Sequence, residues 1–441
     1  MTDLNQPLAH HAATYPAEAI GAELAANLSR NLTDGLAAII GGWNAPGVDD
    51  AARLLIESAR PANSHLFVRG GALAAPFAAQ INATAGHALD FDDTLDAGGG
   101  MHAGALVHSA ALAVADDLGG VDGQTYLSAV AVGLDIAVRL ALAPTQDFGW
   151  HRTSAFGIFG VVGAVGRLLK LNPVQFEHAF GIATSLAGGN RQCIADGALS
   201  KRLQAGFAAR DGILAVQLAL HGLTGARRAF EGKDGFFNLY QRGAYDRTAV
   251  TDGLGEVLLA DRISLKPYPC GRNLHALIDA VLRARSRHDG RAIARIEAGA
   301  HAASSVWPTH VVEAQFSVPF VVALATVTGA ADLAHFADPQ GVDPAIRALG
   351  DKVELIENGP PSLVIHYEDG SSHRETIEPV ATGHPSRPIP LGAVQDKLRA
   401  AHRFAGSPLP EAQIAALIDH ASDLTVLDST SRLTRALSPA S

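Results

Sequence analysis

Successive helical patterns fill the chain from residue 17 to about residue 265. Apolar residues recur there at intervals of three and four, and Gly, Pro, Asn or Asp separate one segment from the next. The pattern predicts helices over 17–42, 49–58, 72–95, 103–117, 124–143, 155–170, 174–187, 201–222 and 226–231. A run of this length predicts a large all-helical domain.

One of these segments carries a glycine at every third position: Gly157, Gly160, Gly163 and Gly166. Glycine weakens a helix by roughly 1 kcal/mol relative to alanine, so four glycines indicate that neighbouring backbones approach closely. We therefore expect a buried helix here. Its uncharged apolar stretch, 155–166, is shorter than the roughly 20 residues that span a bilayer, and we expect no membrane segment.

The pattern changes near Lys266. Residues 291–306 and 352–379 alternate apolar and polar side chains, with turn signals at Asn358-Gly359 and Asp369-Gly370. Helical patterns occur at about 272–285 and 311–328, and they return at 391–404 and 410–422. We predict a mainly α fold, in which a helical domain (1–265, completed by 391–441) receives a smaller inserted α+β domain at 266–390.

Charge and cysteine content narrow the function classes. The formal charge of −10 argues against a nucleic-acid partner, because phosphates call for a basic surface. A small anionic substrate remains possible, since a few cations in one pocket outweigh the global field locally. Two cysteines form no disulfide framework or zinc pattern, and the N-terminus has no signal-peptide pattern. We expect a cytoplasmic protein without a membrane partner.

The stretch HALDFDDTLDAGGGMHAG (87–104) admits several interpretations. Helical spacing would place His87, Asp90 and Thr94 on one face, with the remaining acids as capping or surface groups: Asp92, Asp93 and Asp96. A phosphate loop is excluded because the glycines follow acids that would repel phosphate. No DxDxDG spacing or His-x-x-Glu partner is present, so we expect no metal.

Two further segments carry candidate charged groups. His151 precedes the glycine-patterned helix, where Thr153 or Ser154 is a natural N-cap and the helix dipole lowers a histidine pKa and attracts carboxylates. Lys201 lies in a first helical turn. It is either a solvated charge or a group that projects into an anion-binding pocket.

The stretch KPYPCGRNLHALIDA (266–280) lies where the domain character changes. Lys266 begins a stiff Lys-Pro-Tyr-Pro connection, and Arg272 and His275 follow, three residues apart. Clefts between domains are favoured ligand sites, so these residues are candidates for substrate binding.

Together, these motifs resemble the MmgE/PrpD family. The likeness runs from about residue 15 to the end and rests on HALDFDDT (87–94), WHRTSAFGIFGVVGAVGRLLKL (150–171), SKRLQAGFAARDGILAVQLALHGLTGARRAFEGKDGFF (200–237), KPYPCGRNLHALIDA (266–280), EAQFSVPFVVAL (313–324) and GHPSRP (383–388). Members of this family include 2-methylcitrate dehydratases, cis-aconitate decarboxylases and a cofactor-independent iminodisuccinate epimerase. The resemblance implies a homodimer with an α+β lid, an active site between the domains, and no metal or organic cofactor.

The resemblance also implies roles for individual residues. The positions that match its catalytic motifs are Asp90, Thr94, His102, His151 and Lys201. Lys266 and His275 match substrate-binding positions, and we add Arg272 as a further carboxylate ligand. His102 and His151 are the candidate base and acid, Asp90 orients a neighbour, and Lys201 helps to bind a carboxylate.

Three positions depart from the family pattern. The loop after DDT lacks the usual His-Pro pair, Phe320 replaces a tyrosine, and Gln204 stands where many members have histidine. We expect a cofactor-independent lyase, a dehydratase or decarboxylase, acting on a small di- or tricarboxylic acid. The alternatives are an epimerase of a dicarboxylate such as iminodisuccinate, and an inactive ligand-binding paralogue.

Overall fold

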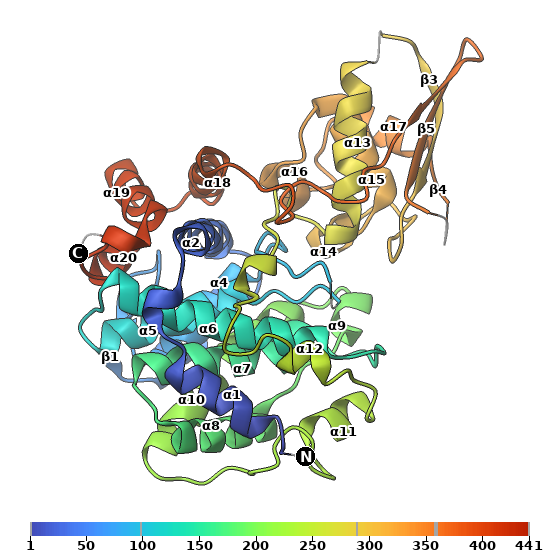
Figure 1. The fold of residues 1–441 in the computed structure, drawn as a ribbon. Coiled ribbons are helices and arrows are strands. Elements are labelled where there is room, and N and C mark those ends of the chain that lie inside the picture. The colour runs from blue at the N-terminus through green and yellow to red at the C-terminus, as the bar shows by residue number, and fades with distance from the viewer. Residues whose placement is uncertain (1, 98, 288–289, 357–359, 440–441) are drawn as a thin grey trace. The chain divides into compact units, whose positions relative to one another are not determined.

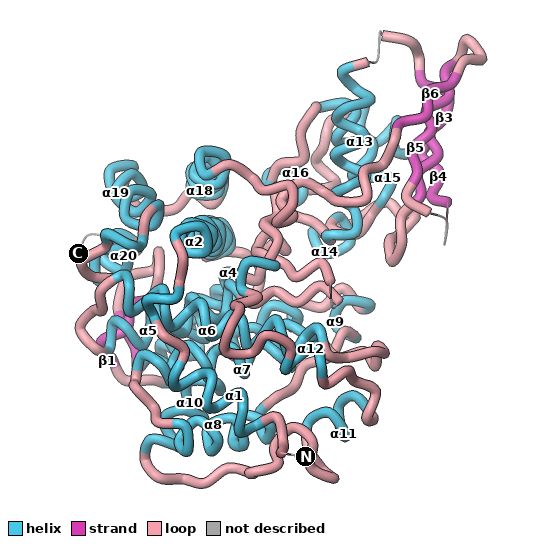
Figure 2. Tube along the Cα trace, viewed as in Figure 1, coloured by secondary structure: helices cyan, strands magenta, loops and turns pink. Residues whose placement is uncertain are grey.

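The protein divides into two compact units. A computed structural model describes residues 2–97, 99–287, 290–356 and 360–439. One unit comprises Met1–Leu265 with Pro390–Ser441, and the other comprises Lys266–Ile389. Helices make up most of the first unit, and the four-stranded sheet lies in the second (Figures 1 and 2). The predicted mainly α fold with a small α+β region is confirmed.

The first unit is built from helices of very different length. They are α1 (Asn5–Thr14), α2 (Ala22–Gly42), α3 (Val48–Ser58), α4 (Ala75–Gly86), α5 (Gly104–Asp117), α6 (Gly123–Leu142), α7 (Arg152–Leu168), α8 (Pro173–Leu186), α9 (Gln192–Ala195), α10 (Ser200–Leu220), α11 (Phe236–Gln241), α12 (Thr248–Thr251), α18 (Leu391–Phe404), α19 (Glu411–Ser422) and α20 (Ser431–Ala436). Short 3₁₀ turns are η1 (Ala17–Ala19), η2 (Ala260–Arg262) and η4 (Leu424–Val426), and β1 (Pro61–His65) pairs with β2 (Ala72–Leu73).

Helices α4, α5, α7 and α10 pack against one another, and α6 packs along α7. The predicted close approach of backbones is found at the α6–α7 contact. A Cβ on Gly160 would lie 2.8 Å from the carbonyl oxygen of Gly133, and a Cβ on Gly133 would lie 2.6 Å from that of Gly160. Glycine is required here because any side chain would push the two helices apart.

Helix α6 is the described helix that is long and apolar enough to cross a membrane by length and composition. However, 89% of its apolar window is buried inside the protein. Its two charged residues, Asp135 and Arg139, are also buried and pair with each other at 2.9 Å. These features are typical of a core helix.

The second unit has its own core beneath a small sheet. Its elements are η3 (Arg272–Leu274), α13 (His275–Ser286), β3 (Ile293–Gly299), α14 (Val311–Ala314), α15 (Val318–Thr328), α16 (Leu333–Ala337), α17 (Pro344–Gly350), β4 (Val353–Ile356), β5 (Ser362–Tyr367) and β6 (Ser372–Glu375). The strand order is β4-β3-β5-β6, with β3 and β4 parallel and the other pairs antiparallel. Helices α13 and α15 pack together and contact the sheet (Figure 1).

Several predicted elements are wrong. The segment 226–231 forms turns instead of a helix, and the predicted helix 72–95 ends at Gly86. A hairpin across Asn358-Gly359 is not formed, because β3 lies between β4 and β5, although residues 358 and 359 themselves lie outside the described part. The turn at Asp369-Gly370 does join the antiparallel strands β5 and β6.

Candidate active site

The predicted acidic helix end is a loop. Helix α4 ends at Gly86 with His87 as its C-cap residue, so the residues that follow do not share a helical face. Asp90 has a left-handed backbone conformation, with φ of +52°. Such a conformation is unfavourable for a residue with a side chain and persists where surrounding contacts enforce it. These contacts come from side chains of the same loop and of α10.

Asp92 joins two histidines through its carboxylate. Its Oδ2 accepts a hydrogen bond from the Nδ1 of His87 at 2.7 Å, and its Oδ1 lies 3.3 Å from the Nδ1 of His102. The Asp92 side chain is completely buried. The expectation that Asp92 is a capping or surface group is therefore wrong, because this carboxylate is buried, hydrogen-bonded to His87 and close to His102.

Lys201 binds Asp90 from the first turn of α10. The Lys201 Nζ lies 2.6 Å from Asp90 Oδ1, and the same oxygen lies 3.8 Å from the Nε2 of His102. Both members of the ion pair are buried, so Lys201 is not a solvated charge. His102 thus lies between the carboxylates of Asp90 and Asp92.

His151 joins the same cluster from the start of α7. Its ring stacks on that of His87 with 5.4 Å between centroids, and His87 contacts His102 edge to face at 4.9 Å. The Nδ1 of His151 lies 2.8 Å from the Oε1 of Gln204, which is on α10 one turn after Lys201. We refer to His87, His102 and His151 as the histidine cluster.

The predicted N-cap of α7 is wrong. His151 occupies the N-cap position, without a capping hydrogen bond from its side chain. Instead, the Thr153 hydroxyl accepts a hydrogen bond from the backbone N–H of His102 at 3.1 Å. This bond connects the loop that precedes α5 to helix α7. The Ser154 hydroxyl donates to the carbonyl of Gly188 at 2.7 Å.

Burial has the largest effect on the pKa values of the ionisable groups in this site. It lowers the pKa of His87 to about 4, and burial together with nearby His87, Lys201 and His102 holds the pKa of His151 well below its ordinary value. Burial alone would raise the pKa of Asp92, but the two histidines hold it well below its usual range. At neutral pH, His87 and His151 are neutral bases and Asp92 is a carboxylate.

Asp93 caps α5. Both carboxylate oxygens accept from the backbone N–H of Gly104 at 3.0 Å, and Oδ2 also accepts from the Asn31 amide at 3.0 Å. A Cβ on Gly104 would lie 2.5 Å from that oxygen, so the cap requires glycine. The capping role expected for Asp93 is found, but in a buried position.

Thr94 and the loop after it bring His102 into place. The backbones of Thr94 and Ser264 exchange two hydrogen bonds, of 2.8 and 2.7 Å. A further bond of 2.7 Å from Leu95 N–H to the Met101 carbonyl returns the chain just before His102. The Thr94 hydroxyl is buried and has no hydrogen-bond partner among the described residues.

The second unit contains the other three predicted residues. Lys266 and His275 are buried. The Arg272 guanidinium donates to the carbonyls of Thr382 and Ala381 and lies 3.3 Å from the Nδ1 of His275, whose Nε2 donates to the Cys270 carbonyl. Arg272 and His275 are thus brought together, and both make hydrogen bonds within the unit.

Phe320 is also in the core of the second unit. It is fully buried, and its ring packs edge to face against Trp307 and Phe336.

His87, Asp92 and His102 form a group that could hold a metal ion. One ligand atom from each lies within 4.8 Å of the others. However, the 2.7 Å between His87 Nδ1 and Asp92 Oδ2 is a hydrogen-bond length. Ligands about 2.1 Å from a shared zinc ion would spread to roughly 3 Å or more. The present geometry fits a proton shared between histidine and carboxylate.

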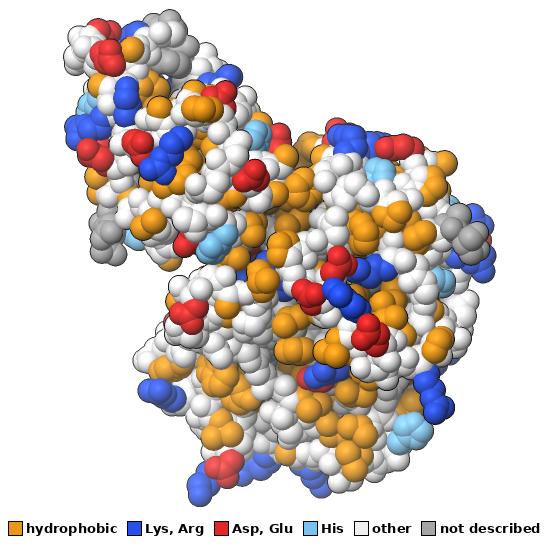
Figure 3. All heavy atoms as spheres, turned by 180° about the vertical axis from the view of Figure 1, so that it is seen from behind, with side chains coloured by type: hydrophobic (Ala, Val, Ile, Leu, Met, Phe, Trp, Pro, Cys, Tyr) orange, Lys and Arg blue, Asp and Glu red, His pale blue; other side chains and the backbone are white. Residues whose placement is uncertain are grey.

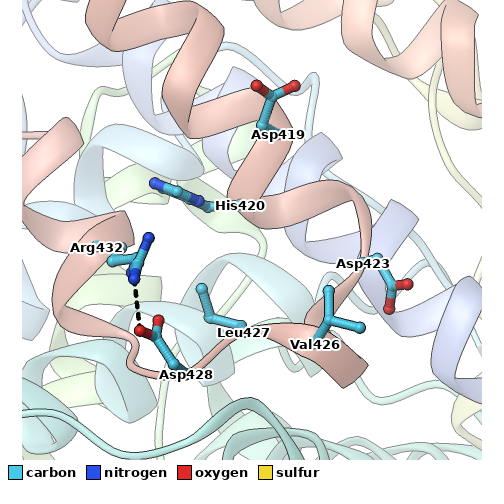
Figure 4. Close-up of a pocket in the computed structure, with 7 residues that line it drawn as sticks. All are labelled: Asp419, His420, Asp423, Val426, Leu427, Asp428 and Arg432. Carbon is cyan, nitrogen blue, oxygen red and sulfur yellow. Dashed lines mark hydrogen bonds and ion pairs between the residues drawn. The ribbon is translucent and has the colours of Figure 1, made fainter.

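A surface pocket lies elsewhere, between α19 and α20. It has a volume of about 240 Å³ and is lined by Asp419, His420, Asp423, Val426, Leu427, Asp428 and Arg432, of which Arg432 pairs with Asp428 (Figure 4). None of the predicted site residues lines it. On the face drawn in Figure 3, Lys and Arg side chains are scattered among acidic and apolar ones.

Sequence analysis assigned no catalytic or binding role to three residues of this site: His87, which belongs to the histidine cluster, and Asp92 and Gln204, which contact the cluster. His87 and Asp92 belong to the HALDFDDT motif. The three aspartates of that motif were a signal that more than one of them contributes to the site. Gln204 follows Lys201 by three residues, so the two share a helix face.

Comparisons with known proteins agree with this architecture. The MmgE/PrpD N-terminal domain matches residues 6–248, and the MmgE/PrpD C-terminal domain matches residues 268–423. A cis-aconitate decarboxylase of Aspergillus terreus is 25% identical over 95% of this chain and 94% of its own length. The mouse cis-aconitate decarboxylase is 26% identical over 82% of this chain and 78% of its own length. A cis-aconitate decarboxylase-like protein of Aspergillus oryzae is 29% identical over 59% of this chain and 57% of its own length. The chain belongs to the MmgE/PrpD family.

Proposed function

We propose that the protein is a lyase, a decarboxylase or dehydratase, that acts on a small di- or tricarboxylic acid by acid/base chemistry. The observation that carries the proposal is the buried cluster in which Lys201, Asp90, His102 and His151 meet. The names of the relatives, cis-aconitate decarboxylases, support the lyase class.

The cluster has the groups that this chemistry needs. Breaking a bond next to a carboxylate passes through a carbanion-like state, which requires a base, a proton donor and a cation. His151 is a neutral base, and Lys201 supplies a cation that Asp90 already orients. His102 is the candidate donor, and the buried Thr94 hydroxyl is available to hold a substrate oxygen.

In this proposal, the second unit supplies cationic side chains that bind the substrate. We assign Lys266 and Arg272 to the binding of substrate carboxylates, with His275 holding Arg272 in place through the 3.3 Å contact. The proposal further includes a homodimer, a cytoplasmic location, and catalysis without a metal or organic cofactor.

The test is an activity assay on the full chain. We expect NMR to detect alkene formation or loss of CO₂ from at least one acid in a panel that includes cis-aconitate. His102→Ala and Lys201→Ala should lower kcat/KM by a hundredfold or more. His10→Ala and Lys233→Ala, at exposed positions, serve as controls. Near-wild-type kinetics in either site variant would remove that residue from the mechanism.

An epimerase is the second candidate, because dehydration requires a proton donor for the leaving hydroxide and Phe320 offers none. Epimerisation needs only two opposed proton carriers. Incubation in D₂O separates the two reactions, since deuterium entering a stereocentre without an alkene product identifies an epimerase. Binding of tricarboxylates without any turnover would identify an inactive paralogue.

A further inference from the structure

We propose that Gln204 is a positioning residue that fixes His151 as the tautomer with its proton on Nδ1, leaving Nε2 as the proton acceptor. The assignment of that acceptor to catalysis rests on the proposed function. The tautomer itself rests on the hydrogen bonds around Gln204 and on the burial of the His151 ring.

The orientation of the Gln204 amide is set on its far side. Its Nε2 donates to the backbone carbonyl of Asn190 at 3.0 Å and to the Sγ of Cys193 at 3.3 Å. A carbonyl oxygen can only accept, so the nitrogen of the amide must face Asn190. The Oε1 of Gln204 therefore faces His151.

This orientation determines where the His151 proton lies. An amide oxygen can only accept, and it lies 2.8 Å from the His151 Nδ1. The ring must therefore donate from Nδ1. The ring is neutral near pH 7 because burial holds the pKa of His151 well below its ordinary value, so it carries a single proton. The other nitrogen, Nε2, then bears a lone pair.

The neighbouring residues hold the His151 ring in this orientation. His87 stacks against one side at 5.4 Å, and the His151 backbone N–H donates to the Gly189 carbonyl at 3.1 Å. No described residue forms a hydrogen bond with the His151 Nε2. Nε2 is thus the nitrogen that can receive a proton from a ligand, and His151 acts first as a base.

Gln204 also occupies the position where many family members carry histidine. Histidine at this position could itself gain or lose a proton, whereas glutamine cannot. In this chain, the partner of His151 stays an acceptor at every pH, so the direction of proton transfer does not change with the protonation of the partner.

The tautomer can be read directly by NMR on the full-length protein labelled with ¹⁵N-histidine. Long-range ¹H–¹⁵N spectra distinguish a protonated Nδ1 from a protonated Nε2, and His151→Gln identifies the signal. We expect protonated Nδ1 in the wild type. In Gln204→Met, which has similar size but no acceptor, we expect this form to be lost. Protonated Nε2 in the wild type would overturn the proposal, as would an unchanged spectrum in Gln204→Met.

Kinetics supply the second readout. Gln204→Met should lower kcat about tenfold or more without a matching rise in KM. Gln217→Met, at a partly exposed position on the same helix, should change neither. An unchanged kcat in Gln204→Met would overturn the role. If no acid in the panel reacts but Nδ1 is protonated, the proposed function fails and the tautomer stands.

Discussion

At the scale of single residues, the site is organised by one carboxylate. Asp92 holds His87 at 2.7 Å and lies 3.3 Å from His102, so it orients two of the three rings in the histidine cluster. Asp90 has the complementary task, because it holds Lys201 and approaches the opposite nitrogen of His102. His102 therefore lies between two carboxylates.

Replacing Asp92 tests this role. Asp92→Asn keeps the size of the side chain but removes the charge that both histidines face, so we expect kcat/KM to fall about a hundredfold. Circular dichroism should show the fold retained. Asp96→Asn, four residues further on and exposed, is the control and should be near wild type. Equal activity in the two variants would show that Asp92 has only a packing role.

The group formed by His87, Asp92 and His102 allows a prediction about metal removal. Because His87 and Asp92 lie at hydrogen-bond distance, we expect dialysis against a chelator to leave kcat/KM and Tm unchanged. Metal analysis before and after dialysis is the measurement, with the Asp92→Asn protein as a reference. A loss of activity restored by a divalent ion would instead assign a metal to His87, Asp92 and His102.

At the scale of elements, periodicity predicts helices well where burial of one face decides the structure. Helix α18 begins and ends at the predicted residues, 391 and 404, and α5 and α6 differ from prediction by one residue at most at each end. Helix α4 is shorter than predicted because side chains after Gly86 form hydrogen bonds and ion pairs with residues that are distant in the sequence. The bond from Lys201 to Asp90 joins residues 111 apart. No local pattern contains such information.

The buried His108 joins three helices and gives a stability prediction. Its Nε2 donates to Asn31 of α2 and its Nδ1 accepts from Tyr126 of α6, each at 2.8 Å. Burial lowers the pKa of His108 to about 3, below the ordinary 6.5. Between these values, the unfolded chain binds the extra proton, so the free energy of unfolding falls as the pH drops.

We expect the free energy of unfolding to fall more steeply with decreasing pH in the wild type than in His108→Gln. Glutamine takes up no proton, so between pH 6.5 and 4 the wild type should lose about 3 kcal/mol more than the variant. Urea unfolding of both proteins at several pH values is the measurement. His10→Gln, at an exposed position, controls for the loss of a histidine. Parallel pH curves for the wild type and His108→Gln would contradict the assignment.

At the scale of the whole molecule, the inserted unit interrupts a domain whose last helices support the site. After residue 389, the chain returns to the first unit, where Lys397 of α18 donates to Asp34 Oδ1 and to the Phe91 carbonyl, both at 2.6 Å. Its ammonium also lies 3.8 Å from the centre of the Phe91 ring. Phe91 lies between Asp90 and Asp92, so the C-terminal part of the chain holds the loop that carries both acids.

The second unit has a hydrophobic core built from its own residues. Its buried cluster runs from Cys270 to Tyr367 and includes Phe320 of α15, Ile296 of β3 and Ile365 of β5. We therefore expect residues 266–389, produced alone, to fold with helical and strand signals and to unfold cooperatively in urea. Phe320→Ala in this fragment removes a fully buried ring and should cost about 3–5 kcal/mol. Phe316→Ala, outside this cluster and only partly buried, should cost less. If the fragment shows no cooperative transition, the core of the second unit depends on the helical unit, and the insertion cannot be treated as a domain of its own.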